Sequence, residues 1–317
     1  MSTVLPHEGP AAALLREMGG AGFLDSAARP FALAPTKPPK RPPSRRELLR
    51  SQPTLLVNGC GRSGTHALVG LLRRNGVSAL HEGHGREATI GWPYVGRLEG
   101  SWKEYWPMSN QPQGSDVHEP IFKVHRNPLS VVRSIAAGLT SSGGCRNPSE
   151  RRWEARAWRC AKRFIPLPMV PQADIESQTT CKLDKAVRMQ LALHYWVKWN
   201  LLADRWAAHT FAVETITVGD LLRRWCDHCD ASKTCTCPQV AADAVRASRG
   251  LALNASHPVH ATAPTPSSGG SERVRARKNH GKRPPLTWAE LELIDANMTR
   301  VARLLAAEYG YSTTDRA

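Results

Sequence analysis

Three glycines, an arginine and two hydroxyl residues lie close together, directly after an apolar run that begins at Leu55. The segment reads Asn58-Gly59-Cys60-Gly61-Arg62-Ser63-Gly64-Thr65-His66, and leucines at helical spacing follow it. A glycine-rich turn between a strand and a helix aims successive backbone N–H groups, and the positive end of the helix dipole, at one anion. The sequence therefore predicts a site for a phosphorylated ligand.

The spacing of this loop nearly matches the Walker A pattern of nucleotide-hydrolysing proteins. Gly59 and Gly64 are correctly placed, but Thr65 occupies the position where that pattern has lysine. Arg62 supplies a cation inside the loop instead, and a guanidinium binds phosphate or sulfate oxygens bidentately without a metal. We therefore expect a metal-independent anion site. A glycine turn that merely connects a strand to a helix is the alternative.

Two further basic segments can complete such a site. Arg126 directly follows the apolar run at residues 121–125, and Ser134 lies two helical turns further along. Both can converge on one phosphate at the sheet edge that carries the glycine loop. A third segment, with Arg277 and Lys278, follows a Pro/Ser/Gly loop and can fold over a bound nucleotide. The alternatives are a helix-entry salt bridge for Arg126 and a solvent-facing role for Ser134.

Together these motifs resemble the sulfotransferases that use 3′-phosphoadenosine 5′-phosphosulfate (PAPS). The loop Gly61-Arg62-Ser63-Gly64-Thr65 resembles the family's 5′-phosphosulfate loop. Arg126 and Ser134 match the arginine and the serine, eight residues later, that bind the 3′-phosphate in that family. The segment Arg277-Lys278-Asn279-His280-Gly281 is similar to a late Arg-Lys-Gly segment, with Asn279 in place of the glycine.

The resemblance covers roughly residues 53–310 and is closer to bacterial and Golgi carbohydrate-type members than to cytosolic ones. The Leu-Thr-Trp opening of the last helix and its Gly310-Tyr311 ending look like those of such relatives. Two departures are Arg62, where cytosolic members usually have lysine, and His66, where many have threonine. The resemblance implies a P-loop NTPase-like fold, no metal, and transfer of a sulfuryl group to a hydroxyl or amine, with a lean towards carbohydrate. The implied cofactor-binding residues are Gly61, Arg62, Ser63, Gly64, Thr65, His66, Arg126, Ser134, Arg277 and Lys278.

An acceptor hydroxyl also needs a general base within hydrogen-bonding reach. Relatives that act on glycans place a base glutamate near the position of His81-Glu82-Gly83-His84, so Glu82 is the first candidate. Histidine serves in cytosolic relatives, so His81, His84 and His125 remain alternatives. A surface carboxylate paired with a cation is an equally weighted role for Glu82. We expect Arg62 to act as the cation on the leaving group.

The elements that must position these residues alternate between strand and helix. Predicted strands cover residues 55–58, 77–80, 121–125 and 210–214, and predicted helices cover residues 65–75, 128–139, 150–165, 182–207, 218–226, 239–248 and 288–309. This alternation predicts an α/β fold with three α/β/α layers around a central parallel sheet, and ligands at the carboxyl ends of the strands.

Composition divides the chain into three expected parts. Residues 1–50 read as a disordered or loosely docked basic arm, residues 51–312 as one sulfotransferase-like domain with a flexible loop at 250–285, and residues 313–317 as a tail. The 317 residues are 41% apolar, which is enough for a substantial core.

The charge of the chain predicts an anionic partner without identifying it. The formal net charge is +16 and the isoelectric point is near 9.9. The expected partners are an anionic nucleotide donor and a hydroxyl-bearing acceptor. Two other functions remain open: a nucleotide-dependent phosphotransferase of the P-loop type, which the missing lysine disfavours, and a non-catalytic basic protein that binds nucleic acid.

The cysteines and the chain start leave the compartment open. Four of the eight cysteines form the cluster Cys226-x2-Cys229-x5-Cys235-x-Cys237, which suits disulfides, a zinc site or free thiols. The sequence lacks a secretory signal pattern in its first 30 residues and an apolar run of about 18 residues, which predicts a soluble protein. The cytoplasm is the default location, and the Golgi lumen is the alternative that the cysteines and the sequons at Asn254 and Asn297 favour.

Overall fold

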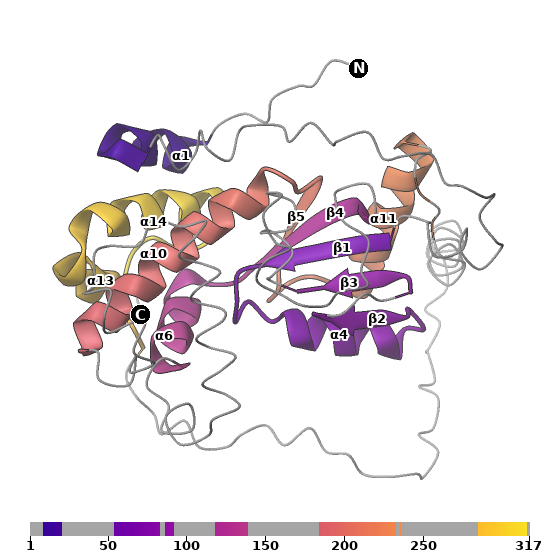
Figure 1. Cartoon of the computed structure of the whole chain (residues 1–317), viewed down its shortest axis with the longest axis horizontal. Helices are drawn as coiled ribbons and strands as arrows, with labels where there is room; N and C mark the ends of the chain where they lie inside the picture. The colour runs from indigo at the N-terminus through magenta and orange to yellow at the C-terminus, as the bar shows by residue number, and fades with distance from the viewer. Residues whose placement is uncertain are drawn as a thin grey trace, which may run out of the picture.

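A parallel five-stranded sheet forms the centre of the computed structural model, which describes residues 9–20, 54–82, 86–91, 118–138, 184–232, 235, 237 and 285–315. The strands are β1 (Thr54–Gly59), β2 (Ala79–His81), β3 (Ala88–Ile90), β4 (His118–His125) and β5 (His209–Ala212). Their order across the sheet is β2-β3-β1-β4-β5, and every neighbouring pair is parallel. The predicted α/β fold with a parallel sheet is confirmed (Figure 1).

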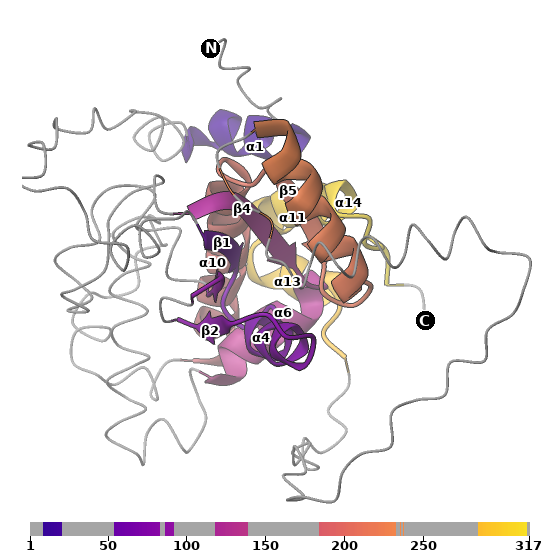
Figure 2. The same ribbon diagram turned by 90° about the vertical axis from the view of Figure 1, so that its right-hand side faces the viewer.

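Helices cover both faces of the sheet. The first face packs against α4 (Thr65–Arg74) and α11 (Val218–Ser232), in a core that includes Leu55 and Val57 of β1. Leu56 points to the other face, where it packs against Trp206, which follows α10 (Lys185–Asp204) in the sequence. A strand that is buried on both faces requires a continuous apolar run and not an alternating pattern. β1 has such a continuous run at residues 55–57. Figure 2 shows α10 and α11 on opposite sides of the strands.

The helix α10 is the hub of the second layer. It is buried nearly all round because α6 (Pro128–Gly138), α13 (Trp288–Ile294) and α14 (Ala296–Glu308) gather about it, to the left of the sheet in Figure 1. The Asp184 carboxylate begins the helix by accepting a hydrogen bond from the Ala186 N–H at 2.7 Å.

A buried ion pair joins this layer to the sheet. Lys123 of β4 is fully buried, and its Nζ lies 2.6 Å from Oδ1 of Asp204, at the end of α10. The hydroxyl of Tyr309 contacts both side chains. Burial lowers the pKa of Lys123, and Asp204 opposes that shift. A buried cation needs such a partner, so Lys123 has a structural role here.

The prediction of one final helix over residues 288–309 is wrong. The structure ends α13 at Ile294 and starts α14 at Ala296, with Asp295 between them in a non-helical conformation, φ −157° and ψ 89°. The Asp295 carboxylate accepts from the Met298 N–H at 2.9 Å and lies 2.8 Å from Nε2 of His194. An aspartate that caps a helix offers the backbone an alternative to continuing the preceding helix, which explains the break.

A short helix that composition did not predict lies near the start of the chain. Helix α1 (Pro10–Leu15), followed by the turn η1 (Arg16–Gly20), packs on α14. Ala11 and Leu15 are buried, and the Ala11 N–H donates to Oε1 of Glu308 at 2.9 Å. This part of the predicted basic arm therefore contacts the core.

The short strands β2 and β3 differ from the predicted ones. The strand expected at 77–80 lies at 79–81, and β3 was not predicted. The helices expected at 150–165 and 239–248 and the loop at 250–285 lie outside the described residues. Among the helices that are described, none is long and apolar enough to cross a membrane.

Candidate functional site

The carboxyl ends of the strands bring the predicted site residues to one edge of the sheet. The glycine loop follows β1, Glu82 follows β2, Arg126 follows β4, and Glu214 comes two residues after β5. Because all the strands are parallel, these four segments leave the sheet on the same side. Ligands of open parallel sheets bind at this edge.

The backbone of the loop explains two of its glycines. Gly64 is the N-cap of α4 with φ +85°, and a Cβ there would lie 2.9 Å from Cγ2 of Val213. Gly59 passes so close to β4 that a Cβ would lie 2.9 Å from the carbonyl oxygen of Val124. Arg62 also has a positive φ, of 71°, which costs a side-chain-bearing residue about 1–3 kcal/mol. Strain of this kind gathers at ligand sites.

The start of α4 offers donors to an anion. No side chain caps it, and the first helical hydrogen bond runs from the Leu68 N–H to the carbonyl of Gly64. The N–H groups of the first turn therefore have no acceptor within the helix. Ser63 is fully buried, and its Oγ has no hydrogen-bond partner in the described part of the chain. A buried hydroxyl without a partner in this glycine-rich loop fits a ligand that supplies the missing oxygen.

One loop N–H already has a protein partner. Gly61 donates to the hydroxyl of Tyr195, on α10, at 3.3 Å, and a Cβ on Gly61 would lie 3.2 Å from that oxygen. Tyr195 therefore supports the loop from the second layer. The sequence does not indicate this role, because Tyr195 is only one of the apolar positions of the helix predicted over residues 182–207.

Two predicted ligand-binding residues meet directly. The Nε of Arg62 donates to Oγ of Ser134, on α6, at 3.2 Å. Arg126 has a different neighbour, because its Nε lies 3.9 Å from Oε1 of Glu214. The structure thus brings Arg62 and Ser134 together and places Arg126 beside a carboxylate that the sequence did not single out.

The base candidates Glu82 and His81 stand next to the loop. Oγ1 of Thr65 lies 3.1 Å from Nε2 of His81, and the rings of His66 and His81 meet edge to face at 4.9 Å. Burial, and then the proximity of His66, lower the pKa of His81 to about 4, so this ring is neutral at pH 7. Nε2 of His81 lies 3.9 Å from Oε1 of Glu82, which has a φ of 54°.

The base candidate His125 packs against two tyrosines near the end of the chain. His125 is 4% exposed, stacks on Tyr309 at 4.3 Å, and has its Nδ1 3.0 Å from the hydroxyl of Tyr311. Burial, and then Lys123, lower its pKa to about 4. These contacts give His125 a packing role. His84, Arg277 and Lys278 lie outside the described residues.

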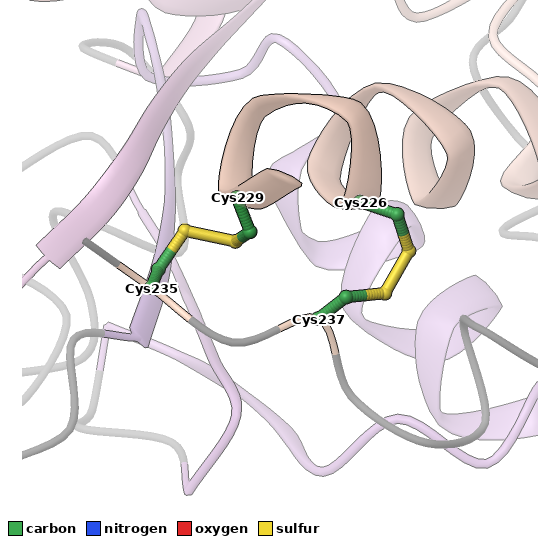
Figure 3. The surroundings of a disulfide bond; sticks show 4 residues. All are labelled: Cys226, Cys229, Cys235 and Cys237. Carbon is green, nitrogen blue, oxygen red and sulfur yellow. A yellow bond between two sulfur atoms is a disulfide. The ribbon is translucent and has the colours of Figure 1, made fainter. Parts of the chain in front are cut away.

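The cysteine cluster forms two disulfides. Cys226 pairs with Cys237 and Cys229 with Cys235, so the helix α11 is tied to the segment that follows it (Figure 3). Of the three states that the sequence left open, this is the one in the structure. Cys60 is a free thiol, and burial raises its pKa far above the ordinary value. No group of three or more metal-ligating side chains that could hold an ion occurs among the described residues.

Comparison of the chain with family models, curated proteins and solved structures finds no significant match.

Proposed function

We propose that this chain is a sulfotransferase of P-loop NTPase-like fold that transfers the sulfuryl group of PAPS to a hydroxyl or amine, with carbohydrate as the favoured acceptor. The observation that supports it most is the hydrogen bond between Arg62 and Ser134. These residues lie 72 positions apart and were singled out by separate motifs. Their contact brings the residue predicted for the 5′-phosphosulfate beside the one predicted for the 3′-phosphate, which supports one ligand shared by both motifs.

The loop and the two basic residues have distinct roles in this proposal. The free N–H groups at the start of α4 and the hydroxyls of Ser63 and Thr65 hold the 5′-phosphate and the sulfonate. Ser134 and Arg126 hold the 3′-phosphate. Arg62 stabilises the negative charge that develops on the bridging oxygen, because a cation aimed at the leaving group lowers the barrier.

The transfer step needs one proton acceptor. The acceptor oxygen attacks sulfur, the bond between sulfur and the 5′-phosphate oxygen breaks, and adenosine 3′,5′-bisphosphate leaves with the electron pair. The acceptor proton passes to Glu82 or to His81, which lie together beside Thr65. The depressed pKa of His81 keeps its ring neutral at pH 7, so this ring has a nitrogen lone pair that can accept the proton.

Binding of the product nucleotide is the direct test. We expect isothermal titration calorimetry in buffer with EDTA to show one site for adenosine 3′,5′-bisphosphate, weakened by Arg62→Ala and Ser134→Ala. Arg303→Ala is the matched control, since Arg303 pairs with Glu292 on α13, in the second layer. Transfer of ³⁵S-labelled sulfate from PAPS to a panel of glycans and small amines then identifies the acceptor.

Three results would contradict the proposal. Absence of bisphosphate binding removes its basis. Magnesium-dependent turnover of ATP would indicate a phosphotransferase instead. Binding of DNA or RNA that falls steeply with salt, without preference for the bisphosphate, would indicate a nucleic-acid-binding protein.

A further inference from the structure

A line of polar contacts leads from Arg126 at the candidate site to the segment that follows α14. The Nε of Arg126 lies 3.9 Å from Oε1 of Glu214. Oε2 of the same carboxylate accepts a hydrogen bond from the hydroxyl of Tyr311 at 2.8 Å. Arg126 follows β4 and Glu214 follows the neighbouring strand β5, so the contact links two adjacent strand ends to the end of the chain.

The direction of each hydrogen bond in this line follows from its proton count. Tyr311 has one hydroxyl proton, which it donates to the Glu214 carboxylate. Its oxygen must then accept from Nδ1 of His125, 3.0 Å away. Nδ1 of His125 therefore carries a proton, and the lowering of its pKa to about 4 makes the ring neutral at pH 7.

The inner end of the line is fixed in the core. The ring of His125 stacks on Tyr309 at 4.3 Å and meets Tyr311 edge to face at 5.3 Å. Gly310, between the two tyrosines, has φ +78°, and both tyrosine rings contact the same histidine. The Tyr309 hydroxyl bonds to Asp204, the partner of Lys123. The buried side chains of His125 and Tyr309 therefore fix the position of Tyr311.

Glu214 acts on the backbone as well as on the guanidinium. Its Oε1 accepts from the Asn127 N–H at 2.9 Å, directly after Arg126 and before the first residue of α6. Burial alone would raise the pKa of Glu214, but the hydrogen bonds from Asn127 and Tyr311 and the charge of Arg126 lower it overall. The carboxylate is therefore ionised at neutral pH, and it contacts both the guanidinium of Arg126 and the peptide N–H of the next residue, Asn127.

We propose that Glu214 and Tyr311 are positioning residues that aim Arg126 at the ribose 3′-phosphate and so set the preference for a 3′-phosphorylated nucleotide. This inference rests on the proposed function. With its Nε turned towards Glu214, Arg126 can present its terminal nitrogens to a phosphate, and ordering a guanidinium before binding reduces the entropy lost on binding. A nucleotide with a 3′-hydroxyl gains no contact between two charged groups, because the hydroxyl is neutral. A 3′-phosphate gains two charge-assisted hydrogen bonds.

The measurement is the ratio of the dissociation constants of adenosine 5′-phosphate and adenosine 3′,5′-bisphosphate, by calorimetry. We expect Glu214→Ala to reduce this ratio roughly tenfold, mainly by weakening bisphosphate binding. Glu214→Gln keeps one acceptor oxygen, for the Asn127 N–H or for the Tyr311 hydroxyl, but loses the second acceptor and the charge, so its ratio should lie between those of Glu214→Ala and the wild type. Tyr311→Phe should also lower the ratio, because it releases Glu214 from the core.

A purely structural role would not change this ratio. Glu292→Ala removes another carboxylate that pairs with an arginine, Arg303, and should leave the ratio unchanged. If Glu214→Ala does not fold, Glu214→Gln and Tyr311→Phe carry the test. Unchanged ratios in the folded variants, beside a wild type that prefers the bisphosphate, overturn the inference and leave the proposed function intact. A wild type that binds neither nucleotide overturns both.

Discussion

Nε of Arg62 and Oγ of Ser134 lie 3.2 Å apart and join the loop after β1 to the helix after β4. Neither residue reaches the other through local structure, since α4, β2, β3 and β4 intervene in the sequence. The parallel pairing of β1 with β4 places the two segments side by side. The contact ties Arg62, which has a positive φ, to the helix that follows β4.

Removal of the Arg62 side chain should weaken binding of adenosine 3′,5′-bisphosphate by about 10- to 100-fold, the usual size of a charge-assisted hydrogen bond. Arg62→Lys keeps the charge but has a single nitrogen, whereas the planar guanidinium can contact Ser134 and the ligand through different nitrogens. We therefore expect Arg62→Lys to lose less affinity than Arg62→Ala. Calorimetric titration of Arg62→Ala, Ser134→Ala and the double variant tests the coupling. Strictly additive losses would show that the two side chains act independently.

Replacement of Gly64 by alanine should lower the free energy of unfolding by about 1–3 kcal/mol, because φ is +85° and the new Cβ would press on Val213. Gly70→Ala is the matched control in the same helix. A Cβ there meets only the Arg74 side chain, at 3.4 Å, so this change should stabilise α4 by roughly 1 kcal/mol. Urea denaturation of both variants measures the difference. Equal effects of the two substitutions would contradict the role given to Gly64.

The order of strands and helices around the site could be predicted because each element carries its own signal. The apolar run from Leu55 marks β1, and the leucines from Leu68 to Leu72 mark the buried face of α4. Pro128 at the first position of α6 likewise marks a helix start. Strands of three residues are too short to show a period, so β2 was predicted with shifted bounds and β3 was missed.

The contacts that support the site had no local signal. Tyr195 reaches Gly61 from α10, and Tyr311 reaches Glu214 from the end of the chain. Such pairs depend on the packing of the second layer, which periodicity does not encode. The sequence did contain one signal for the break, because an aspartate is a common N-cap residue and Asp295 accepts from the Met298 N–H. The apolar spacing on both sides of Asp295 fits one continuous helix, and the prediction followed that spacing.

Acidification should destabilise the protein through His125 and His81. The pKa of each falls from an ordinary value of 6.5 to about 4 in the folded chain, so only the unfolded chain takes up a proton in between. The free energy of unfolding therefore decreases as the pH falls from 6.5 to 4, by about 3 kcal/mol for His125 alone. Asn in place of His125 keeps a donor for Tyr311 without titrating. Urea denaturation at several pH values in this range measures the free energy of unfolding. This free energy should change less with pH in His125→Asn than in the wild type, and an equal change would contradict the buried neutral state.

The double disulfide at the end of α11 should make stability depend on redox conditions. The pairs close short loops, with sequence separations of 11 and 6, and Cys226 and Cys229 are buried in the core beneath the sheet. Loops of this size correspond to about 2–4 kcal/mol for a native disulfide. Reduction with a phosphine should therefore lower the melting temperature, whereas Cys226→Ala/Cys237→Ala should reproduce part of that loss without reductant.

Mass spectrometry after alkylation identifies the state of each thiol in this cluster. Protein purified without reductant should show Cys226, Cys229, Cys235 and Cys237 protected, and reduction before alkylation should label all four. Zinc bound by four thiolates would behave differently, because a chelator rather than a reductant would then lower the melting temperature. Chelator sensitivity together with free thiols would overturn the disulfide pairing. Reductant sensitivity alone would place the working form of this protein in an oxidising environment.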